Sequence, residues 1–376
     1  MLSSKINSYT SSNSSNKKNI FVVNDKKNDK APTKIENEHL MDINKMKELI
    51  KNTPYAEKFE LIESIKEGSA GTVYKTKLRD SKINKFFASK FLITEKNKEK
   101  RKNKEKNELS KHFEISIHGK LIHKNIPKIF GYYKIHDSSC ILMEYDMYGD
   151  LENFKRKIIK RAVLSESLIC YIGAQILEAI SYLHKNKIIH MDIKQQNILI
   201  DDFLSIKLTD FSISINYKNL KTISLPLLGT CYYISPETLE ERTINPEDAN
   251  KIDIYSFGVL LYVLAFCDYP YELRNVDSKN YEGILKSIKE KDLVFPENTG
   301  HSNMFKDFLG KCLEKNFSLR FNIFEAMNHP WVKGFHFLQD EKERIYNAGK
   351  FLTNLLVDNI LEYNKYISKF NKRMIN

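Results

Sequence analysis

The 376-residue sequence lacks several features that would assign it to other classes of protein. Its five cysteines are far apart, with no CxxC pair and no histidine spacing typical of a structural zinc site, so they are expected to be ordinary thiols in a reducing compartment. No segment approaches the roughly 18 apolar residues of a membrane span. The N-terminus has neither an apolar signal core nor a glycine at position 2. We therefore expect no membrane association and a cytoplasmic location, with the nucleus left open.

The chain has a net charge of +12, and little of this charge lies in its middle part. Residues 1–58 carry 11 lysines and 7 acidic residues, residues 94–111 carry 8 basic and 4 acidic residues, and residues 332–376 carry 8 basic and 5 acidic residues. The remaining core is therefore close to neutral, and a nucleic-acid partner is not expected because such binding needs a basic face. A basic arm that contacts nucleic acid or acidic lipid is the alternative interpretation of the charged appendages.

The N-terminal appendage has two parts. Residues 1–37 are rich in Ser, Asn and Lys, with one short apolar patch at Ile20 to Val23, and this composition predicts disorder. Between Glu38 and Lys51 the apolar residues recur at helical spacing, and Pro54 follows as a stop. Residues 38–58 are therefore expected to be a short helical lead-in.

The C-terminal appendage, residues 332–376, is predicted to be helical because a set of apolar residues shares one helical face. The set comprises Leu352, Leu356, Ile360, Tyr363, Ile367 and Phe370. Such a stripe usually packs on its own domain, which predicts a self-docking C-terminal helix. Docking of a partner, including an activating one, is the alternative.

Between the appendages the pattern changes from strands to helices. A small antiparallel sheet is predicted from the segments FELIESI, TVYKTKL and KFFASKFLI. Residues 94–124, which follow these three segments, predict a long charged helix, and two further strands are expected at FGYYKIH and CILMEYD. After Asp150 helices are expected, for example at residues 166–186 and 253–267, interrupted by strand-like NILI and IKLTD. The prediction is an α+β fold with a β-rich lobe at 59–145 and an α-rich lobe at 146–331.

The segment IIHMDIKQQNILI, residues 188–200, places a carboxylate, an ammonium and a carboxamide at fixed intervals in a short loop. Phosphoryl transfer needs these parts: Asp192 can orient a hydroxyl and accept its proton, Lys194 can neutralise the transferring phosphoryl group, and Asn197 can hold a magnesium ion. A solvated polar loop would explain the composition alone. It does not explain the order and spacing followed by an apolar strand, which favour catalysis.

Eleven residues beyond Leu199, the predicted strand KLTDFS ends in Asp210, and a carboxylate there can bridge magnesium to nucleotide phosphates. With these motifs in order, the sequence resembles the eukaryotic protein kinase family over essentially all of residues 59–331. Asp192 matches the aspartate of the catalytic HRD motif, written here as HMD, and Asp210 that of DFG, written here as DFS. The resemblance implies a two-lobed protein kinase fold that uses ATP and Mg²⁺.

The resemblance also implies a glycine-rich turn over the ATP phosphates, which here is KEGSAGTV, with Lys66 in place of the first glycine. Gly68 and Gly71 would let backbone amides approach the phosphates. Lys90 in FASK matches the strand lysine that contacts the α- and β-phosphates. The nucleotide contacts implied for these strands are Ile65, Lys66, Gly68, Ser69, Gly71, Val73, Ala88 and Lys90.

Further implied contacts lie downstream. Glu114 matches the helix glutamate that forms an ion pair with Lys90, and Met143 matches the gatekeeper, which lines the pocket while packing in the core. The residues after Met143 match the hinge whose backbone pairs with adenine. Asp150 in YGDL is expected to reach the ribose. The remaining implied nucleotide contacts are Met143, Glu144, Asp146, Asp150 and Leu199.

The segment GTCYYISPE matches the family's peptide-docking platform, so a protein is the expected substrate and a small-molecule kinase is disfavoured. Thr230 is expected to support Asp192. Glu237 and Arg320 are expected to form a buried ion pair, and Asp253 in DIYSFG to brace the catalytic loop. These last three are interpreted as structural residues.

A lysine two residues after the catalytic aspartate, with GT before the platform, is the pattern of serine/threonine kinases. The resemblance therefore implies transfer of the γ-phosphate of ATP to Ser or Thr. The expected catalytic residues are Lys90, Glu114, Asp192, Lys194, Asn197 and Asp210, of which Asn197 and Asp210 are the expected metal ligands.

Besides Lys66, three residues depart from the family pattern. Met191 replaces the HRD arginine, which removes the usual partner of a phosphate on Thr222 or Ser224; Ser212 replaces the DFG glycine. His118 falls where an apolar residue is expected, so the active state could depend on a partner or on the flanking helices. The alternative function is a pseudokinase, a nucleotide-binding scaffold. That alternative predicts loss of a catalytic group, whereas all of the expected groups are present.

Overall fold

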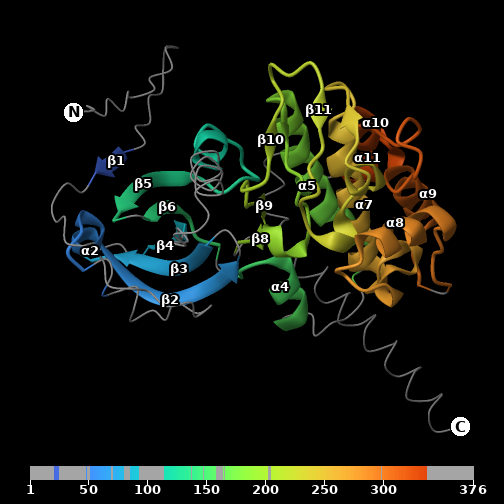
Figure 1. Ribbon diagram of the computed structural model, residues 1–376. Coiled ribbons are helices and arrows are strands. Elements are labelled where there is room, and N and C mark those ends of the chain that lie inside the picture. Colours follow the sequence, from blue (N-terminus) through green and yellow to red (C-terminus); the bar gives the residue numbers. More distant parts are fainter. Residues whose placement is uncertain are drawn as a thin grey trace, which may run out of the picture.

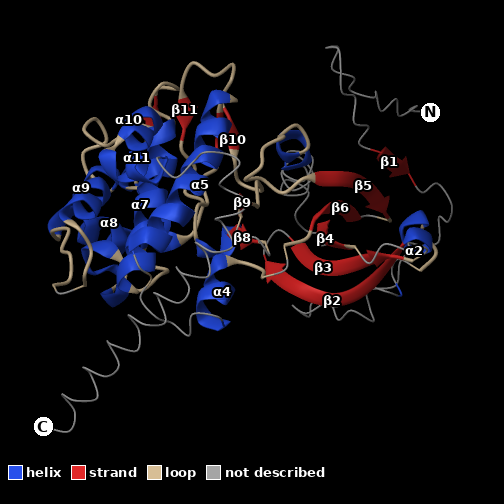
Figure 2. Ribbon diagram, turned by 180° about the vertical axis from the view of Figure 1, so that it is seen from behind, coloured by secondary structure: helices blue, strands red, loops and turns tan. Residues whose placement is uncertain are grey.

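The computed structural model describes residues 21–24, 48, 51–68, 71–79, 85–92, 114–136, 138–146, 148–157, 164, 166–201, 205–297 and 299–336. A β-sheet lies on one side and a group of helices on the other, with β8, β9 and α4 next to the sheet (Figures 1 and 2). The predicted two-lobed α+β fold is confirmed. Among the described residues, no helix is both long enough and apolar enough to cross a membrane.

The sheet of the N-lobe has the strand order β1-β5-β6-β4-β3-β2. Its strands are β1 (Phe21–Asn24), β2 (Phe59–Gly68), β3 (Gly71–Leu78), β4 (Phe86–Leu92), β5 (Ile129–Ile135) and β6 (Ser138–Glu144). The strands from β2 to β6 pair antiparallel. All five were predicted from the alternating or continuous apolar runs in the sequence.

Strand β4 positions the site because its two faces differ. Phe87 and Phe91 belong to an aromatic cluster on one face, which helix α2 (Pro54–Lys58) covers with Tyr55. Side chains alternate along a strand, so Ala88 and Lys90 face the other way. Ala88 packs there with Met143 of β6. The period of two therefore directs a lysine toward the C-lobe from an otherwise buried strand.

Three features near the N-lobe differ from the sequence predictions. Strand β1 pairs in parallel with β5 inside the segment that was expected to be disordered, because the apolar patch there can add to an open sheet edge. A separate short helix, α2, begins at Pro54, where the sequence was expected only to stop the preceding helix; proline suits the first helical position. The helix expected at 94–124 is described only at residues 114–118, followed by a turn at 119–120. The expected self-docking helix at 332–376 lies outside the described residues beyond residue 336.

The C-lobe is mostly helical. Its helices are α4 (Leu151–Lys157), α5 (Glu166–Lys185), α6 (Pro236–Leu239), α7 (Asn250–Phe266), α8 (Tyr281–Glu290), α9 (Asn303–Cys312), α10 (Ile323–Asn328) and α11 (Pro330–His336), with 3-10 turns η1 (Gln195–Asn197), η2 (Cys231–Tyr233) and η3 (Pro270–Asn275). Short strands pair as β7 (Ile188–Ile189) with β10 (Ile215–Asn216), β8 (Ile198–Ile200) with β9 (Ile206–Leu208), and β11 (Ile223–Ser224) with β12 (Thr243–Ile244).

Helix α7 is the centre of this lobe. Its residues from Lys251 to Ala265 are all buried, as expected for a helix that is apolar on every side. The packing is close: a Cβ added at Gly258 would lie 2.9 Å from the Cβ of Cys312. Helix α9 can therefore approach the α7 backbone closely, and the catalytic loop between α5 and β8 rests on a rigid support.

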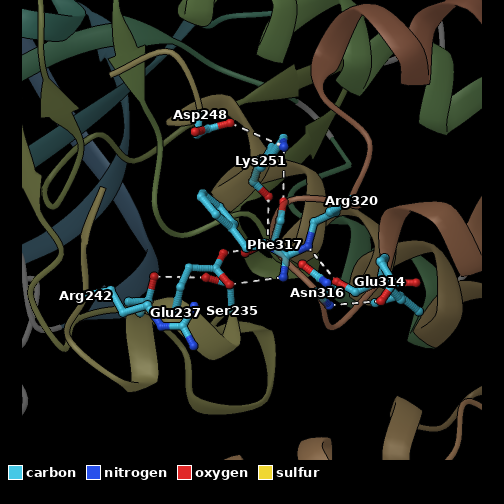
Figure 3. Close-up of polar contacts among 12 residues, drawn as sticks. Ser235, Glu237, Arg242, Asp248, Lys251, Glu314, Asn316, Phe317 and Arg320 are labelled. Carbon is cyan, nitrogen blue, oxygen red and sulfur yellow. Dashed lines mark hydrogen bonds and ion pairs between the residues drawn. The ribbon is translucent and has the colours of Figure 1, made fainter. Parts of the chain in front are cut away.

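A buried ion pair fixes the platform segment to this support, as predicted. Arg320 donates to the two carboxylate oxygens of Glu237 in α6, over 2.5 and 3.0 Å, and both side chains are almost fully buried (Figure 3). Arg320 also donates to the carbonyl oxygen of Glu314 at 2.9 Å. Because a bidentate pair defines the orientation of both side chains, α6 is held in one position on the C-lobe.

Replacing Arg320 by alanine would leave the Glu237 carboxylate buried without a partner. We expect Arg320→Ala to lower the free energy of unfolding by about 3–5 kcal/mol, measured by chemical denaturation. Arg242→Ala is the matched control, because Arg242 forms an ion pair with Glu240 on the surface with about half of its side chain exposed. The control should cost less than about 1 kcal/mol. Equal losses in the two variants would contradict this assignment.

Candidate active site

Lys90 lies between two carboxylates that come from different parts of the chain. Its Nζ is 2.7 Å from Oε1 of Glu114, in the helical residues 114–118, and 2.9 Å from Oδ1 of Asp210, which follows β9. Lys90 and Glu114 are almost fully buried, whereas about a quarter of the Asp210 side chain is exposed. The structure therefore brings together three of the residues that the sequence predicted, in the pairing expected for Lys90 and Glu114.

The charges of this group follow from burial and proximity. Burial alone would lower the pKa of Lys90, but the Glu114 and Asp210 carboxylates outweigh it and raise the pKa, so the amine is an ammonium. Burial raises the pKa of Asp210, but the Lys90 ammonium, with smaller contributions from Ser212 and Lys66, outweighs burial and holds the pKa well below its usual range. Burial also raises the pKa of Glu114, against the effect of Lys90. A charged lysine from β4 and an ionised Asp210 from the segment after β9 thus lie side by side.

The catalytic loop holds the Asp192 carboxylate by several contacts. Thr230 donates from Oγ1 to Oδ1 of Asp192 at 2.8 Å, and Asn197 donates from Nδ2 to Oδ2 at 2.8 Å. The Lys194 ammonium lies 2.7 Å from the same Oδ2 and 2.6 Å from Thr230 Oγ1. The three residues predicted from the loop are therefore in mutual contact, and Thr230 supports Asp192 as expected.

The backbone of this loop is strained and is held from below. Met191 has a positive φ of 72°, which a methionine rarely adopts. The buried carboxylate of Asp253 accepts hydrogen bonds from the backbone amides of His190 at 2.9 Å and Met191 at 3.0 Å. His184 lies 2.7 Å from the same carboxylate. Asp253 thus braces the catalytic loop, as predicted.

Asn197 and Asp210 present the oxygen atoms that suit magnesium. Asn197 uses its Nδ2 for Asp192, so its Oδ1 is the atom left for a cation, and Asp210 supplies an ionised carboxylate. Carboxylate and amide oxygens are hard ligands of the kind that Mg²⁺ prefers. In the described part of the chain, no cluster of three or more His, Cys, Asp or Glu side chains could hold a metal alone. The two residues therefore fit a magnesium ion that takes further ligands from phosphate or water.

An apolar wall lies on the inner face of the sheet next to Lys90. Ala88 and Met143 are buried in one cluster, with Val73 of β3 packed against it. Such a surface can hold a flat aromatic base. Gly71 has a φ of +139°, and a Cβ there would lie 2.1 Å from the carbonyl oxygen of Phe91, so only glycine fits where β3 begins. Ser69 lies outside the described residues.

The residues predicted to contact the nucleotide around the hinge also form contacts within the protein. Leu199 of β8 forms a bridge with Asp150, whose two carboxylate oxygens accept hydrogen bonds from Asn153 at 2.8 and 2.7 Å at the start of α4. Lys207 of β9 lies 2.7 Å from Oε1 of Glu144 and 3.2 Å from Oδ1 of Asp146. The sequence did not indicate the role of Lys207, because a lysine in a strand of a lysine-rich chain is unremarkable.

The contact of Lys66 was also not foreseen. Its Nζ donates to the carbonyl oxygen of Gln196 at 2.7 Å and to Oδ1 of Asn197 at 3.4 Å. Partial burial lowers the pKa of Lys66, while the Asp210 and Asp150 carboxylates act in the opposite direction. The glycine-rich turn therefore contributes a cation that reaches the catalytic loop of the other lobe.

Comparison with known proteins agrees with this geometry. The family model described as "Protein kinase domain" matches residues 59–332. Calcium-dependent protein kinase 5 of Plasmodium berghei (strain Anka) is 30% identical over 260 residues, which are 67% of this chain and 42% of that protein. The Aurora kinases of Debaryomyces hansenii and Eremothecium gossypii are each 30% identical over 73% of this chain.

The matches cover 62% of the Debaryomyces protein and 69% of the Eremothecium protein. The chain thus spans about two fifths to two thirds of the length of these curated relatives. Within that span the matched family model contains every residue of the Lys90, Asp192 and Asp210 groups. Because the match to the family model covers most of the sequence and includes the described site, this chain belongs to the protein kinase family.

Proposed function

We propose that the protein is an active ATP-dependent serine/threonine protein kinase. The observation that carries the proposal is that two groups needed for phosphotransfer, one to bind the nucleotide and one to act on the acceptor, are both held in place by contacts within the protein. Lys90 is held between Glu114 and Asp210, and Asp192 is held by Thr230, Asn197 and Lys194. A scaffold that only bound nucleotide would not require the second group.

The residues of the first group would bind and orient the nucleotide. Lys90, kept charged by Glu114, can grip the α- and β-phosphates, and the apolar wall around Met143 can hold the base. Mg²⁺, when bound by Asp210 and Asn197, supplies neutralising charge to the phosphates. The protein's contribution here is positioning, since the charged groups are already fixed by their mutual contacts.

The residues of the second group would act on the acceptor. Asp192 Oδ2 and Oδ1 are each already contacted, which fixes the carboxylate plane, and the carboxylate can orient a hydroxyl and accept its proton. Lys194 can neutralise charge that develops on the transferring group. The contact between Lys194 and Thr230 supports a serine or threonine acceptor, because it joins the lysine and the GT motif of the serine/threonine pattern.

The segment that contains Thr222 and Ser224, called the activation segment here, is held by apolar contacts where the family commonly uses an arginine and a phosphate. Met191 is buried in a cluster with Ile223 and Leu225, whereas the alternate residues Thr222 and Ser224 are exposed. Strand β11 pairs with β12, which fixes this alternation. This arrangement supports a segment that is ordered without phosphorylation, in line with the loss of the usual arginine at Met191.

The two other departures fit the structure. Ser212 has no positive φ, so it adopts a backbone conformation open to any residue, and its hydrogen bond helps to lower the pKa of Asp210. His118 is buried against the ring of Phe211, with ring centres 4.7 Å apart, and its Nε2 lies 2.8 Å from the carbonyl oxygen of Pro127. Burial lowers the pKa of His118 to about 4, so the ring is neutral and can replace an apolar side chain.

The proposed function predicts the effect of Asp192→Asn, which keeps the shape of the side chain but removes the base. We expect kcat for transfer from MgATP to a generic protein substrate to fall by about 100-fold or more, with label on Ser and Thr in the wild type. ATP-induced thermal stabilisation should persist in the variant. Asp268→Asn, at a surface ion pair with Arg274, is the matched control and should retain activity.

Retained activity in purified Asp192→Asn would contradict the role of this carboxylate. If the wild type binds ATP but transfers no phosphate, the result would favour the nucleotide-binding scaffold or a missing activator. Label found only on tyrosine would contradict the serine/threonine assignment.

The pKa of His118 predicts how stability depends on pH. Because the folded-state pKa lies below the unfolded value of 6.5, the unfolded protein binds the proton first, and stability is lost as the pH falls from about 6.5 to about 4. The loss should reach about 3 kcal/mol. His118→Leu removes this titration, so its unfolding free energy, measured by urea denaturation across this pH range, should fall less steeply. Parallel profiles for wild type and variant would show that His118 is not the group responsible.

A further inference from the structure

Lys66 lies near the end of β2 that points toward the C-lobe near α4 and β8 (Figures 1 and 2). A β-bulge lies directly before it. Ser64 pairs with Tyr74 and Lys66 pairs with the next residue, Val73, so Ile65 is the extra residue of the bulge. Cross-strand partners share a face, and Val73 packs on the apolar wall. Lys66 therefore lies on the face of the sheet that carries Val73, and its side chain extends to the catalytic loop.

The ammonium of Lys66 reaches Oδ1 of Asn197, the oxygen of the catalytic loop that is assigned to the metal. Asn197 Nδ2 donates to the carbonyl oxygen and to Oδ2 of Asp192, each at 2.8 Å, which fixes the amide and points Oδ1 the other way. Lys66 Nζ lies 3.4 Å from that Oδ1 and donates to the neighbouring carbonyl oxygen of Gln196 at 2.7 Å. A cation from the N-lobe is thus placed beside the expected metal ligand.

The same oxygen cannot serve both cations well. A magnesium ion binds oxygen at about 2.0–2.1 Å, and a positive charge already beside that oxygen repels it. Lys90 and Lys194 add positive charge nearby, which also acts on Lys66. A metal that binds Asn197 therefore has to displace the Lys66 ammonium, and the interlobe hydrogen bond to Gln196 then weakens.

We propose that Lys66 and a divalent cation compete for Oδ1 of Asn197, so that Lys66 latches the glycine-rich turn to the catalytic loop in the metal-free protein. This inference rests on the proposed function, since it concerns the metal site of the same reaction. Lys66 is a positioning residue in this account. It lowers the affinity for the metal at Asn197 and couples metal binding to release of the turn.

The test is Mn²⁺ binding, measured by the electron paramagnetic resonance of free Mn²⁺ in the presence of a non-hydrolysable ATP analogue. Lys66→Met removes the charge and keeps an unbranched side chain of similar size, and its affinity for Mn²⁺ at Asn197 should be about three- to tenfold higher than that of the wild type. Lys66→Arg should stay close to the wild type. Lys58→Met, at an exposed position in α2, is the control for a general loss of charge and should have no effect.

A double-variant cycle separates the latch from an indirect effect. In the Asn197→Ala background the gain from Lys66→Met should disappear, because the shared oxygen is gone. Equal or weaker Mn²⁺ binding in Lys66→Met, or a gain that survives in Asn197→Ala, overturns the proposal while leaving the proposed function intact. Absence of analogue-dependent Mn²⁺ binding in every variant, the wild type included, overturns both.

Discussion

Lys90 forms ion pairs with two carboxylates that come from different parts of the chain, and these contacts position the other groups of the site. One ammonium satisfies a carboxylate from residues 114–118 and another from the segment after β9, so a strand, a helix and the C-lobe meet at a single point. Because Glu114 is almost fully buried, separating it from Lys90 would leave an unpaired charge away from water. The geometry of these three residues is therefore a property of the folded chain and does not have to be created by a ligand.

The C-lobe uses buried polar groups in the same way, as supports for strained or charged segments. Asp253 holds the backbone turn at Met191, and the Glu237–Arg320 pair holds the platform (Figure 3). At the activation segment the support is apolar, through Met191 and its neighbours. Both polar supports are joined to the buried helix α7, since Asp253 belongs to it and Arg320 also donates to the carbonyl oxygen of its Lys251. The loops that carry the functional residues are thus placed on a fixed base.

The sequence was most informative where a function needs fixed residue types at fixed spacing. The loop with Asp192, Lys194 and Asn197 and the strand-end Asp210 were found from such spacing, and the five antiparallel strands from their apolar patterns. The Lys90–Glu114 pair was implied by the family resemblance that these motifs carry. The bulge at Ile65 was not predictable, because it depends on the register between β2 and β3. The contacts of Lys66 and Lys207 follow from tertiary placement: Lys66 departs from the glycine pattern but its partners are not evident from the sequence, and Lys207 does not stand out among 60 basic residues. Pairing of β1 with β5 likewise depends on an open sheet edge.

We propose that the charged groups around Lys90 and Asp192 form one site for ATP with a divalent cation. Calorimetric titration of ATP with and without Mg²⁺, on the wild type and on Asp210→Asn, tests it most directly. We expect Mg²⁺ to strengthen ATP binding to the wild type and to have little effect on the variant, which has lost the ionised ligand. ATP binding to the wild type that is absent, or that is the same with and without Mg²⁺, would contradict it.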